Sequence, residues 1–381
     1  MKRGWRRRQD NRSEFFPSEQ KNDTHRNTST PDDTVETIDF FDSDTTLDEL
    51  LPISTTAISI RHSLDEVVVG QRNAKDAISV LLSAHLSGAR GHGKRESPNA
   101  LLIGPTGVGK THSVQTAVEY LGLPFVNVDS TALVPSDIHE GMTIEKVLIE
   151  LIISAETILA EANMFAEISG AELAARGLIF LDEFDKLRAG KESDWNLRVQ
   201  RRLLRLIEGS FPAIREMRGE VLDTSQIVFL ASGTFEGIRD PSITSRRPAQ
   251  LTSALRDPDR VVSADLVTYG FLPELIARLP VLVPFESLSV DDLVGILQTP
   301  AVDPTNVWRQ HFAKMGKELI VEDGAKLLLA ENAEKLNMGA RGLQQVMFPM
   351  LARMSFGLDD SPGRTLVISR EMCEKQLRMG W

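Results

Sequence analysis

Eight consecutive residues have the types and spacing that bind a phosphate chain. The segment Gly104-Pro105-Thr106-Gly107-Val108-Gly109-Lys110-Thr111 follows an apolar run and precedes a helical pattern of apolar residues. Glycines at these positions let backbone N–H groups turn toward an anion, and the dipole of the following helix adds positive potential. In such a P-loop, Lys110 reaches the terminal phosphates and Thr111 offers its hydroxyl to Mg²⁺. We therefore expect a nucleotide site here, rather than a turn that binds nothing.

Two neighbouring carboxylates, Asp182 and Glu183, stand at the end of another apolar run, residues 177–181. A buried parallel strand brings the residues at its carboxyl end to the edge of the sheet where P-loop ligands bind. Asp182 is then placed to hold hydrated Mg²⁺, and Glu183 to polarise an attacking water. The alternative is a pair of solvated acids at a strand end. With the P-loop present, the pattern favours hydrolysis of Mg·ATP.

Further apolar runs define the elements that must position these residues. Runs at 99–103, 124–129, 226–232 and 281–285 are separated by helical patterns, which is typical of a parallel sheet with crossover helices. The strand at 226–232 ends in small polar residues that can sense the γ-phosphate. A helix beginning after Gln71 is well placed to cover an adenine ring.

The chain after residue 289 changes character and predicts a second, mainly helical domain. Helices are expected at 290–297, 324–336 and 343–356, with extended pieces at 319–321 and 366–368. Residues 1–46 are polar, basic and then acidic, and cannot bury enough apolar surface to fold. We expect a disordered tail over 1–46, a large α/β ATPase domain over 47–286 and a small C-terminal domain over 287–381.

Composition limits the classes of partner. The net charge of −11 argues against a general nucleic-acid binder. A single cysteine, Cys373, excludes an intramolecular disulfide and a multi-cysteine zinc module, and favours a reducing cytoplasm; we interpret it as a small buried side chain. Because no apolar run is long enough to span a bilayer, we expect a soluble, cytoplasmic protein without a membrane partner.

Between about residues 64 and 370 the sequence resembles the ClpX/HslU family of AAA+ protein unfoldases. The motifs that support this are Val69-Gly70-Gln71, Asp182-Glu183-Phe184-Asp185-Lys186-Leu187, Val199-Gln200-Arg201, Leu206-Ile207-Glu208-Gly209, Ala231-Ser232-Gly233-Thr234-Phe235, residues 272–280 and Gly339-Ala340-Arg341. The resemblance implies an α/β fold in which a P-loop AAA+ parallel sheet with flanking helices is followed by a smaller, mainly helical domain.

The resemblance also implies roles for individual residues. Arg278 looks like the arginine finger, which a subunit offers to the γ-phosphate of its neighbour, and Arg341 looks like the sensor-2 arginine. Catalysis would then rest on Glu183, Lys110 and Arg278, with the metal held by Thr111 and Asp182. The implied ATP contacts are Val69, Gly70, Pro105, Thr106, Gly107, Val108, Gly109, Lys110, Thr111, His112, Asp182, Glu274 and Arg341. Because Arg278 would act in trans, the resemblance implies a homo-oligomeric ring, by family analogy a hexamer.

Several parts depart from the family pattern. The first pore loop, 135–141, has Ile138 followed by His139 where the family has an aromatic residue and a hydrophobic one. The second, 210–219, keeps Arg215 and Arg218, which either attract acidic substrates or are solvated loop charges. The Ile-Gly-Phe tripeptide by which ClpX rings dock on the ClpP peptidase is absent, as is the long intermediate domain of HslU. A peptidase partner therefore stays open.

Three functions are compatible with these motifs. The preferred one is Mg·ATP hydrolysis by a hexameric ring that unfolds or remodels protein substrates, with ATP and Mg²⁺ as its cofactors. A nucleic-acid motor or loader is the second, which the acidic composition disfavours. The third is a nucleotide-switched scaffold that assembles on ATP without translocating a substrate; the altered pore loop favours it, and the intact Glu183 argues against it.

Overall fold

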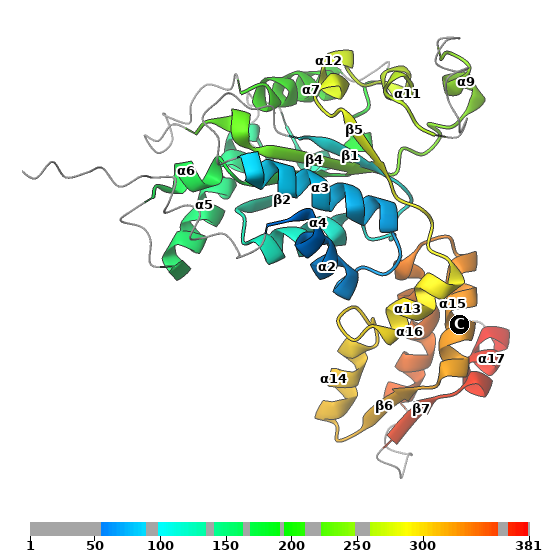
Figure 1. The fold of residues 1–381 in the computed structure, drawn as a ribbon. Coiled ribbons are helices and arrows are strands. Elements are labelled where there is room, and N and C mark those ends of the chain that lie inside the picture. The colour runs from blue at the N-terminus through cyan, green and yellow to red at the C-terminus, as the bar shows by residue number, and fades with distance from the viewer. Residues whose placement is uncertain are drawn as a thin grey trace, which may run out of the picture. The chain divides into compact units, whose positions relative to one another are not determined.

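The computed structural model describes residues 55–88, 98–134, 141–162, 168–190, 194–209, 222–247, 260–356 and 365–379. Within them, five parallel strands form one sheet in the order β2-β3-β4-β1-β5 (Figure 1). The strands are β1 (Ala100–Ile103), β2 (Phe125–Asp129), β3 (Leu178–Asp182), β4 (Val228–Gly233) and β5 (Val281–Pro284). Each coincides with an apolar run, so the predicted parallel α/β sheet is confirmed.

The register of this sheet brings the carboxyl ends of its strands together. β1 lies between β4 and β5, and Ile103 pairs with Gly233. Asp182, at the end of β3, pairs with Asp129 at the end of β2. The P-loop, which follows β1, therefore leaves the sheet beside the ends of β3 and β4, where the predicted acidic and small polar residues lie.

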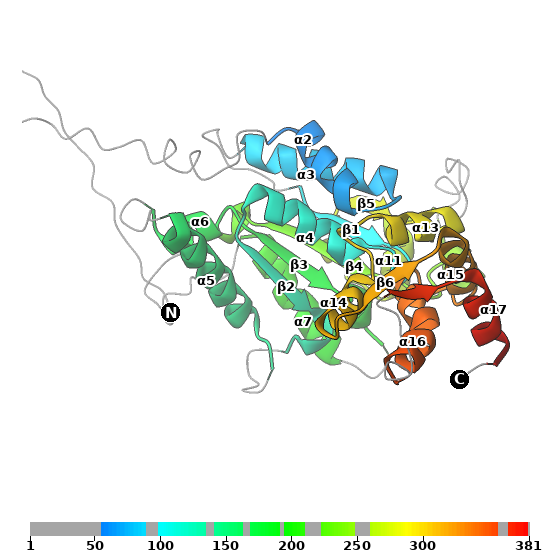
Figure 2. The ribbon, with the colours of Figure 1, turned by 90° about the horizontal axis from the view of Figure 1, so that it is seen from below.

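Helices cover both faces of the sheet (Figures 1 and 2). On one face, Ala100 and Leu102 pack with α2 (Ala57–Val67), α3 (Arg72–Gly88) and α4 (Lys110–Leu121). On the other, Leu101 and Ile103 share a core with α5 (Ile144–Ala162), α7 (Asp194–Ile207), α11 (Ser263–Tyr269) and α12 (Pro273–Ala277). The shorter elements are η1 (Ser130–Ala132), α6 (Gly170–Ala174), η2 (Phe184–Leu187), η3 (Thr224–Gln226) and α9 (Pro241–Thr244). Strand side chains alternate between two apolar cores, as a sheet covered on both faces requires.

The chain after β5 is mainly helical, as predicted. Its elements are α13 (Val290–Gln298), α14 (Asn306–Lys314), β6 (Glu318–Val321), α15 (Asp323–Lys335), α16 (Ala340–Phe356), β7 (Thr365–Ile368) and α17 (Arg370–Met379). The two short strands pair in parallel. Cys373 on α17 is fully buried, as interpreted from the sequence, and this burial raises the pKa of its thiol to about 11.

The structure does not test the predicted boundaries between the tail, the large domain and the small domain. The expected tail over 1–46 and the start of the large domain at 47 lie outside the described residues. All the described residues belong to one compact unit, so the boundary between 286 and 287 stays a prediction. None of the helices in the described ranges combines the length and the apolar composition needed to cross a membrane.

Candidate nucleotide site

The P-loop forms one wall of a pocket of about 680 Å³ at the carboxyl ends of the strands. Its glycines adopt the left-handed conformation, with φ of 72° at Gly107 and 97° at Gly109, which L-residues rarely adopt. α4 begins at Lys110, directly after the loop. A strand, a glycine turn and a helix N-terminus therefore follow one another, in the context that a phosphate-binding loop requires.

Lys110 is buried and lies folded against the loop that precedes it. Its Nζ donates hydrogen bonds to the carbonyl oxygens of Gly104 (2.8 Å) and Pro105 (2.7 Å). Burial lowers the pKa of Lys110 to about 8; Arg341 adds to that shift, whereas Asp182 and Asp185 oppose it. An anion bound in this pocket would stabilise the charged ammonium.

Asp182 connects the P-loop to the ends of β3 and β4. Its Oδ2 accepts a hydrogen bond from the hydroxyl of Thr111 (2.7 Å), and its Oδ1 accepts one from the hydroxyl of Ser232 (2.5 Å). A carboxylate and a hydroxyl thus lie side by side, and oxygen ligands of this kind suit Mg²⁺. No group of three or more His, Cys, Asp or Glu side chains in the described ranges could hold a metal alone.

Glu183 follows Asp182 and lines the same pocket. Its φ of 51° and ψ of 35° place a non-glycine residue in the left-handed region, where it ends β3 and precedes η2. Such conformations are unfavourable and concentrate at functional sites. Glu183 thus connects the buried strand β3 directly to η2 at the edge of the pocket.

Asp185 and Thr234 form a second polar link between β3 and β4. The carboxylate of Asp185 is almost fully buried and accepts hydrogen bonds from Thr234 through its backbone N (3.3 Å) and its hydroxyl (3.2 Å). Both residues line the pocket, as do Lys186 and Glu236. Asp185, Lys186 and Thr234 belong to two motifs that are recognisable in the sequence but were not predicted to line the site, and Glu236 belongs to neither motif.

The pocket also has an apolar wall, which comes from distant parts of the chain. It consists of Val67, Val68, Val69, Leu288, Ile296, Ala301 and Val302. Only Val69 was predicted, because the C-terminal members follow the P-loop by nearly two hundred residues and carry no motif. An apolar wall in the same pocket as a phosphate-binding loop has the chemistry that a nucleobase requires.

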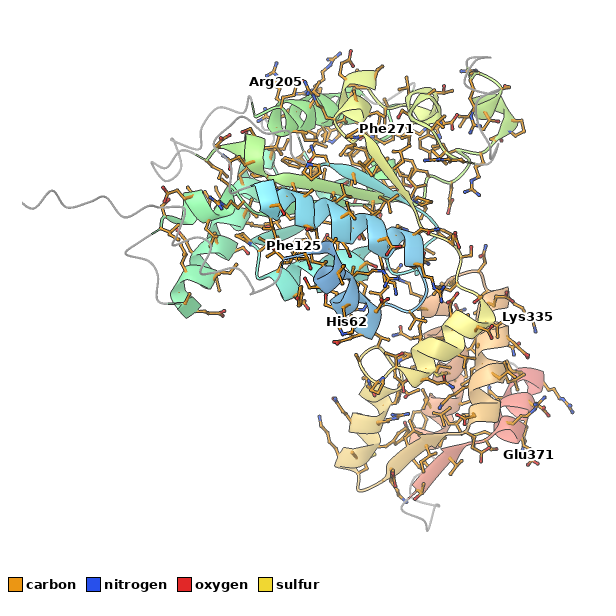
Figure 3. All side chains as sticks on the ribbon, in the orientation of Figure 1. His62, Phe125, Arg205, Phe271, Lys335 and Glu371 are labelled. Atoms are coloured by element: carbon orange, nitrogen blue, oxygen red, sulfur yellow. The ribbon has the colours of Figure 1, made fainter. Side chains whose placement is uncertain are left out.

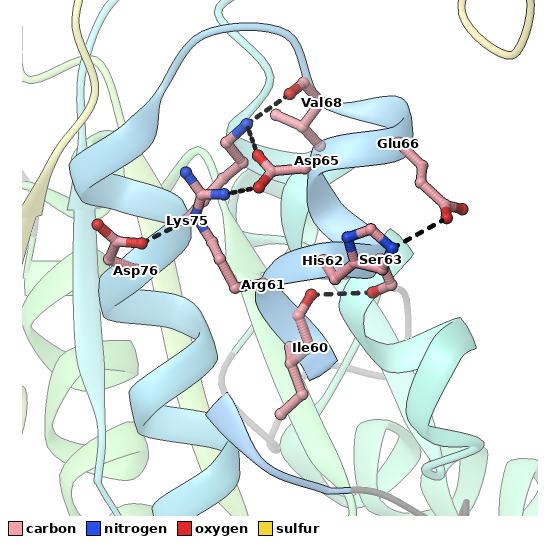
Figure 4. Close-up of polar contacts among 9 residues, drawn as sticks. All are labelled: Ile60, Arg61, His62, Ser63, Asp65, Glu66, Val68, Lys75 and Asp76. Carbon is pink, nitrogen blue, oxygen red and sulfur yellow. Dashed lines mark hydrogen bonds and ion pairs between the residues drawn. The ribbon is translucent and has the colours of Figure 1, made fainter. Parts of the chain in front are cut away.

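Ion pairs between α2 and α3 fix the turn that carries Val68 (Figure 4). The buried Nζ of Lys75 donates to the carbonyl of Val68 (2.8 Å) and to Asp65 (2.6 Å), while Arg61 pairs with Asp65 and with Asp76. Burial, with a contribution from Arg61, lowers the pKa of Lys75 to about 8. The apolar wall is thus supported by charged groups outside the pocket.

Arg341 reaches the P-loop from the C-terminal part of the chain. Its Nη1 donates a hydrogen bond to the hydroxyl of Thr106 (3.1 Å), and the backbone N of Ala340 donates to the carbonyl of Gly107 (2.9 Å). The contact is so close that a Cβ added to Gly107 would lie 2.2 Å from the carbonyl oxygen of Met338. The Gly339-Ala340-Arg341 motif therefore packs directly on the phosphate-binding loop.

The predicted site residues separate into four groups. Val69, Thr106, Gly107, Val108, Gly109, Lys110, Thr111, His112, Asp182, Glu183 and Arg341 all line the one pocket. Pro105 lines a second, smaller cavity, and a Cβ added to Gly70 would lie 2.8 Å from Oδ1 of Asp292. Arg278 and Glu274 do not line the pocket of their own chain. The tentative pore-loop residues Ile138, His139, Arg215 and Arg218 lie outside the described residues.

Arg278 lies at the end of α12, where its Nη2 is 3.0 Å from Oε1 of Glu208, just beyond the end of α7. Both side chains are partly exposed, at 45% and 32%. Glu274 is in the first turn of the same short helix. Arg278 and Glu274, both predicted from the sequence to act on ATP, thus lie at the two ends of one short helix and do not line the pocket of their own chain.

Comparison with known proteins agrees with this geometry. A family model for the AAA domain (Cdc48 subfamily) matches residues 95–282. The chain is 29% identical over 352 residues to the ATP-dependent Clp protease ATP-binding subunit ClpX of Porphyromonas gingivalis, which covers 84% of this chain and 82% of that protein. The corresponding subunit of Treponema denticola is 29% identical, covering 83% and 81%, and ClpX 2 of Wolinella succinogenes is 29% identical, covering 78% and 76%.

Proposed function

The chain is a ClpX-like AAA+ ATPase, and from this premise we propose that it acts as a ring that unfolds or remodels proteins at the expense of Mg·ATP. The observation that carries this proposal is the position of Arg278. The pocket is lined by the P-loop, both acidic residues and Arg341. The other arginine predicted to act on the nucleotide, Arg278, lies instead at an exposed surface. A neighbouring subunit that contributes Arg278 would complete the site.

In this proposal the residues of one chain bind and orient the nucleotide. Lys110 contacts the terminal phosphates, the apolar wall holds the base, and Arg341 contacts the phosphates from the C-terminal part of the chain. Thr111 and Asp182 would hold Mg²⁺, which when bound supplies positive charge to the phosphate oxygens. Glu183 orients the attacking water and accepts its proton.

In this proposal the neighbouring subunit supplies the guanidinium of Arg278. Arginine suits this task because its guanidinium is always protonated and can donate two hydrogen bonds to phosphate oxygens at once. Such a group acts mainly on the transition state, where charge develops on the transferred γ-phosphoryl group. Hydrolysis would therefore depend on assembly, and the number of subunits that we propose is six.

Protein substrates are proposed from the relatives, which are named as ATP-binding subunits of a protease. The missing Ile-Gly-Phe tripeptide favours a ring that works without ClpP or with another peptidase. The cytoplasm remains the predicted location.

The test combines hydrolysis and unfolding in one assay. Steady-state ATPase activity of the full chain and of Glu183→Gln is measured while the unfolding of a tagged fluorescent protein is followed. Hydrolysis with loss of fluorescence, both abolished by the substitution, would support an unfoldase. Hydrolysis without unfolding would indicate a remodeller with a dedicated partner. Salt-sensitive stimulation of hydrolysis by DNA would indicate a nucleic-acid motor. Absence of hydrolysis under ring-forming conditions would indicate a scaffold.

A further inference from the structure

Gln200 on α7 is fully buried and binds three backbone groups with one side-chain amide. Its Nε2 donates hydrogen bonds to the carbonyl oxygens of Leu187 (2.8 Å) and Gly270 (3.2 Å), and its Oε1 accepts one from the backbone N of Leu272 (2.8 Å). Both amide hydrogens and the carbonyl oxygen are therefore used. A buried polar side chain satisfied in this way fixes the segments that it joins.

The segments that Gln200 joins lead to Glu183 in the pocket of the same chain and to Arg278, the proposed arginine finger. Leu187 ends η2, the single turn that begins after Glu183. Leu272 immediately precedes α12, the five-residue helix after which Arg278 follows. So short a helix has little stability of its own and depends on tertiary contacts for its position. The amide thus lies between the pocket of its own chain and the helix that presents the finger.

Aromatic contacts reinforce the same connection. Phe184 in η2 stacks on Phe271, with ring centroids 4.9 Å apart and planes inclined by 15°. The guanidinium of Arg188 lies 4.5 Å from the ring centroid of Tyr269. The hydroxyl of Tyr269 donates a hydrogen bond to the carbonyl of Glu236, a residue that lines the pocket (3.1 Å). The segment before α12 therefore contacts the pocket on two sides. One side is η2, which follows the acidic pair at the end of β3, and the other is Glu236, which follows β4.

α7 also holds the far end of α12. Glu208 follows Gln200 by about two helical turns and forms the ion pair with Arg278. Phe271 lies in the packed interior and Arg205 on the outer side of α7 (Figure 3). α7 and the residue after it therefore contact both ends of the segment that carries Arg278. Gln200 binds the start of this segment through a buried amide, and Glu208 binds its end through an exposed ion pair.

We propose that Gln200 is a positioning residue that couples the nucleotide pocket of its own chain to Arg278, and so controls how that chain serves the pocket of its neighbour. This inference rests on the proposed function, in which Arg278 acts in trans. A displacement of η2 on nucleotide binding or hydrolysis would be transmitted through the amide and the stacked rings to α12. A subunit would thereby report its own nucleotide state to the next subunit.

The test separates the two roles of a subunit by mixing two variants. One, the acceptor, carries Arg278→Ala and keeps an intact pocket; the other, the donor, carries Glu183→Gln and keeps its finger. Neither variant alone should hydrolyse ATP well, whereas mixed rings should recover activity where an acceptor pocket meets a donor finger. Gln200→Met is then introduced into either the donor or the acceptor.

The expected result is asymmetric. Gln200→Met in the donor lowers the recovered ATPase rate by about tenfold, whereas in the acceptor it changes that rate by about twofold or less. Equal losses in both positions, or a larger loss in the acceptor, would overturn the inference and make Gln200 a residue of general structural importance. If the unsubstituted mixture recovers no activity, trans action fails and the inference fails with it.

Two further variants keep the result independent of folding defects. Arg188→Gln removes the contact with Tyr269 from an exposed position and should lower the rate by about threefold, again only in the donor. Asn99→Met is the matched control, because Asn99 is a buried amide that accepts a hydrogen bond from Phe229 at the opposite end of the sheet (2.8 Å). Its effect should be the same in donor and acceptor, and an asymmetric effect would contradict the assignment to Gln200.

Discussion

The nucleotide pocket and the surface around Arg278 differ in what a single chain supplies. In the pocket, the P-loop, the acidic pair Asp182-Glu183 and Arg341 converge from three parts of the sequence. At the surface, Arg278 has only the carboxylate of Glu208 as its ion-pair partner in the described residues. The first region brings together the groups that we propose bind the nucleotide, whereas the second presents a cation outside the pocket of its own chain.

In the proposed function, this difference means that one chain binds the nucleotide and depends on another to hydrolyse it. Binding groups act on the ground state and the transition state alike, whereas a finger delivered from outside acts mainly on the transition state. Substitutions in the two regions should therefore change different kinetic constants. The predictions below use this separation, from the largest effect to the smallest.

Arg278→Ala should lower kcat by about 1,000-fold or more while nucleotide binding is retained, because an arginine finger stabilises charge that develops only in the transition state. Steady-state ATPase rates and binding of a fluorescent nucleotide measure the two quantities. Arg370→Ala is the matched control, since it removes another exposed ion pair, with Glu374 on α17. Loss of nucleotide binding in Arg278→Ala would contradict the separation of the two regions.

Glu183→Gln should lower kcat by about 100-fold, because the amide cannot accept the proton of the attacking water. The amide keeps the size of the side chain, so ATP binding and ring assembly should persist. Single-turnover hydrolysis and sedimentation of the ATP-bound variant measure these effects. A variant that hydrolyses ATP at the parental rate would remove Glu183 from the chemistry.

The amount of structure that the sequence predicts depends on how local the signal is. The five strands were predicted because a strand buried on both faces is a continuous apolar run, such as residues 178–181. α14 was missed because its packing relies on two aromatic residues, Trp308 and Phe312, and not on a full apolar stripe. α17 was missed because its residues are mostly polar.

The site shows the same limit. The P-loop, the acidic pair and the Gly339-Ala340-Arg341 motif are short strings whose chemistry is visible in the sequence. Leu288, Ile296 and Val302 enter the pocket only because the chain after β5 folds back toward the P-loop. Their types are ordinary for a core, so no spacing distinguishes them from residues that only pack. The positions of the pore-loop residues remain predictions.

The affinity for nucleotide should fall several-fold as the pH rises from 7.5 to 9, because the pKa of Lys110 in the free chain is about 8. The folded-state pKa is lowered, so the ammonium is charged below about pH 8 and loses its proton above it. Only the charged form attracts phosphate. Titration of the chain with a fluorescent nucleotide across this range measures the effect, and Lys110→Met should bind weakly with no such decline. An equal decline in that variant would assign the titration to another group.

Glu208→Gln should have the smallest effect, an increase in kcat of about threefold with KM unchanged. An exposed ion pair contributes roughly 0–1 kcal/mol, so removal of the carboxylate frees Arg278 for a neighbouring phosphate at little cost to stability. ATPase rates over a range of ATP concentrations give both constants, and the same substitution in Arg278→Ala should change neither. A large loss of kcat would show that Glu208 orients the finger instead of competing for it.

The central claim is that hydrolysis requires Arg278 from a second chain. ATPase activity per subunit is therefore measured over a wide range of protein concentrations, with assembly followed by sedimentation in the same buffer. We expect the specific activity to rise with the fraction of assembled subunits and to be negligible in the monomer. Full specific activity at concentrations where the chain is monomeric would contradict the account.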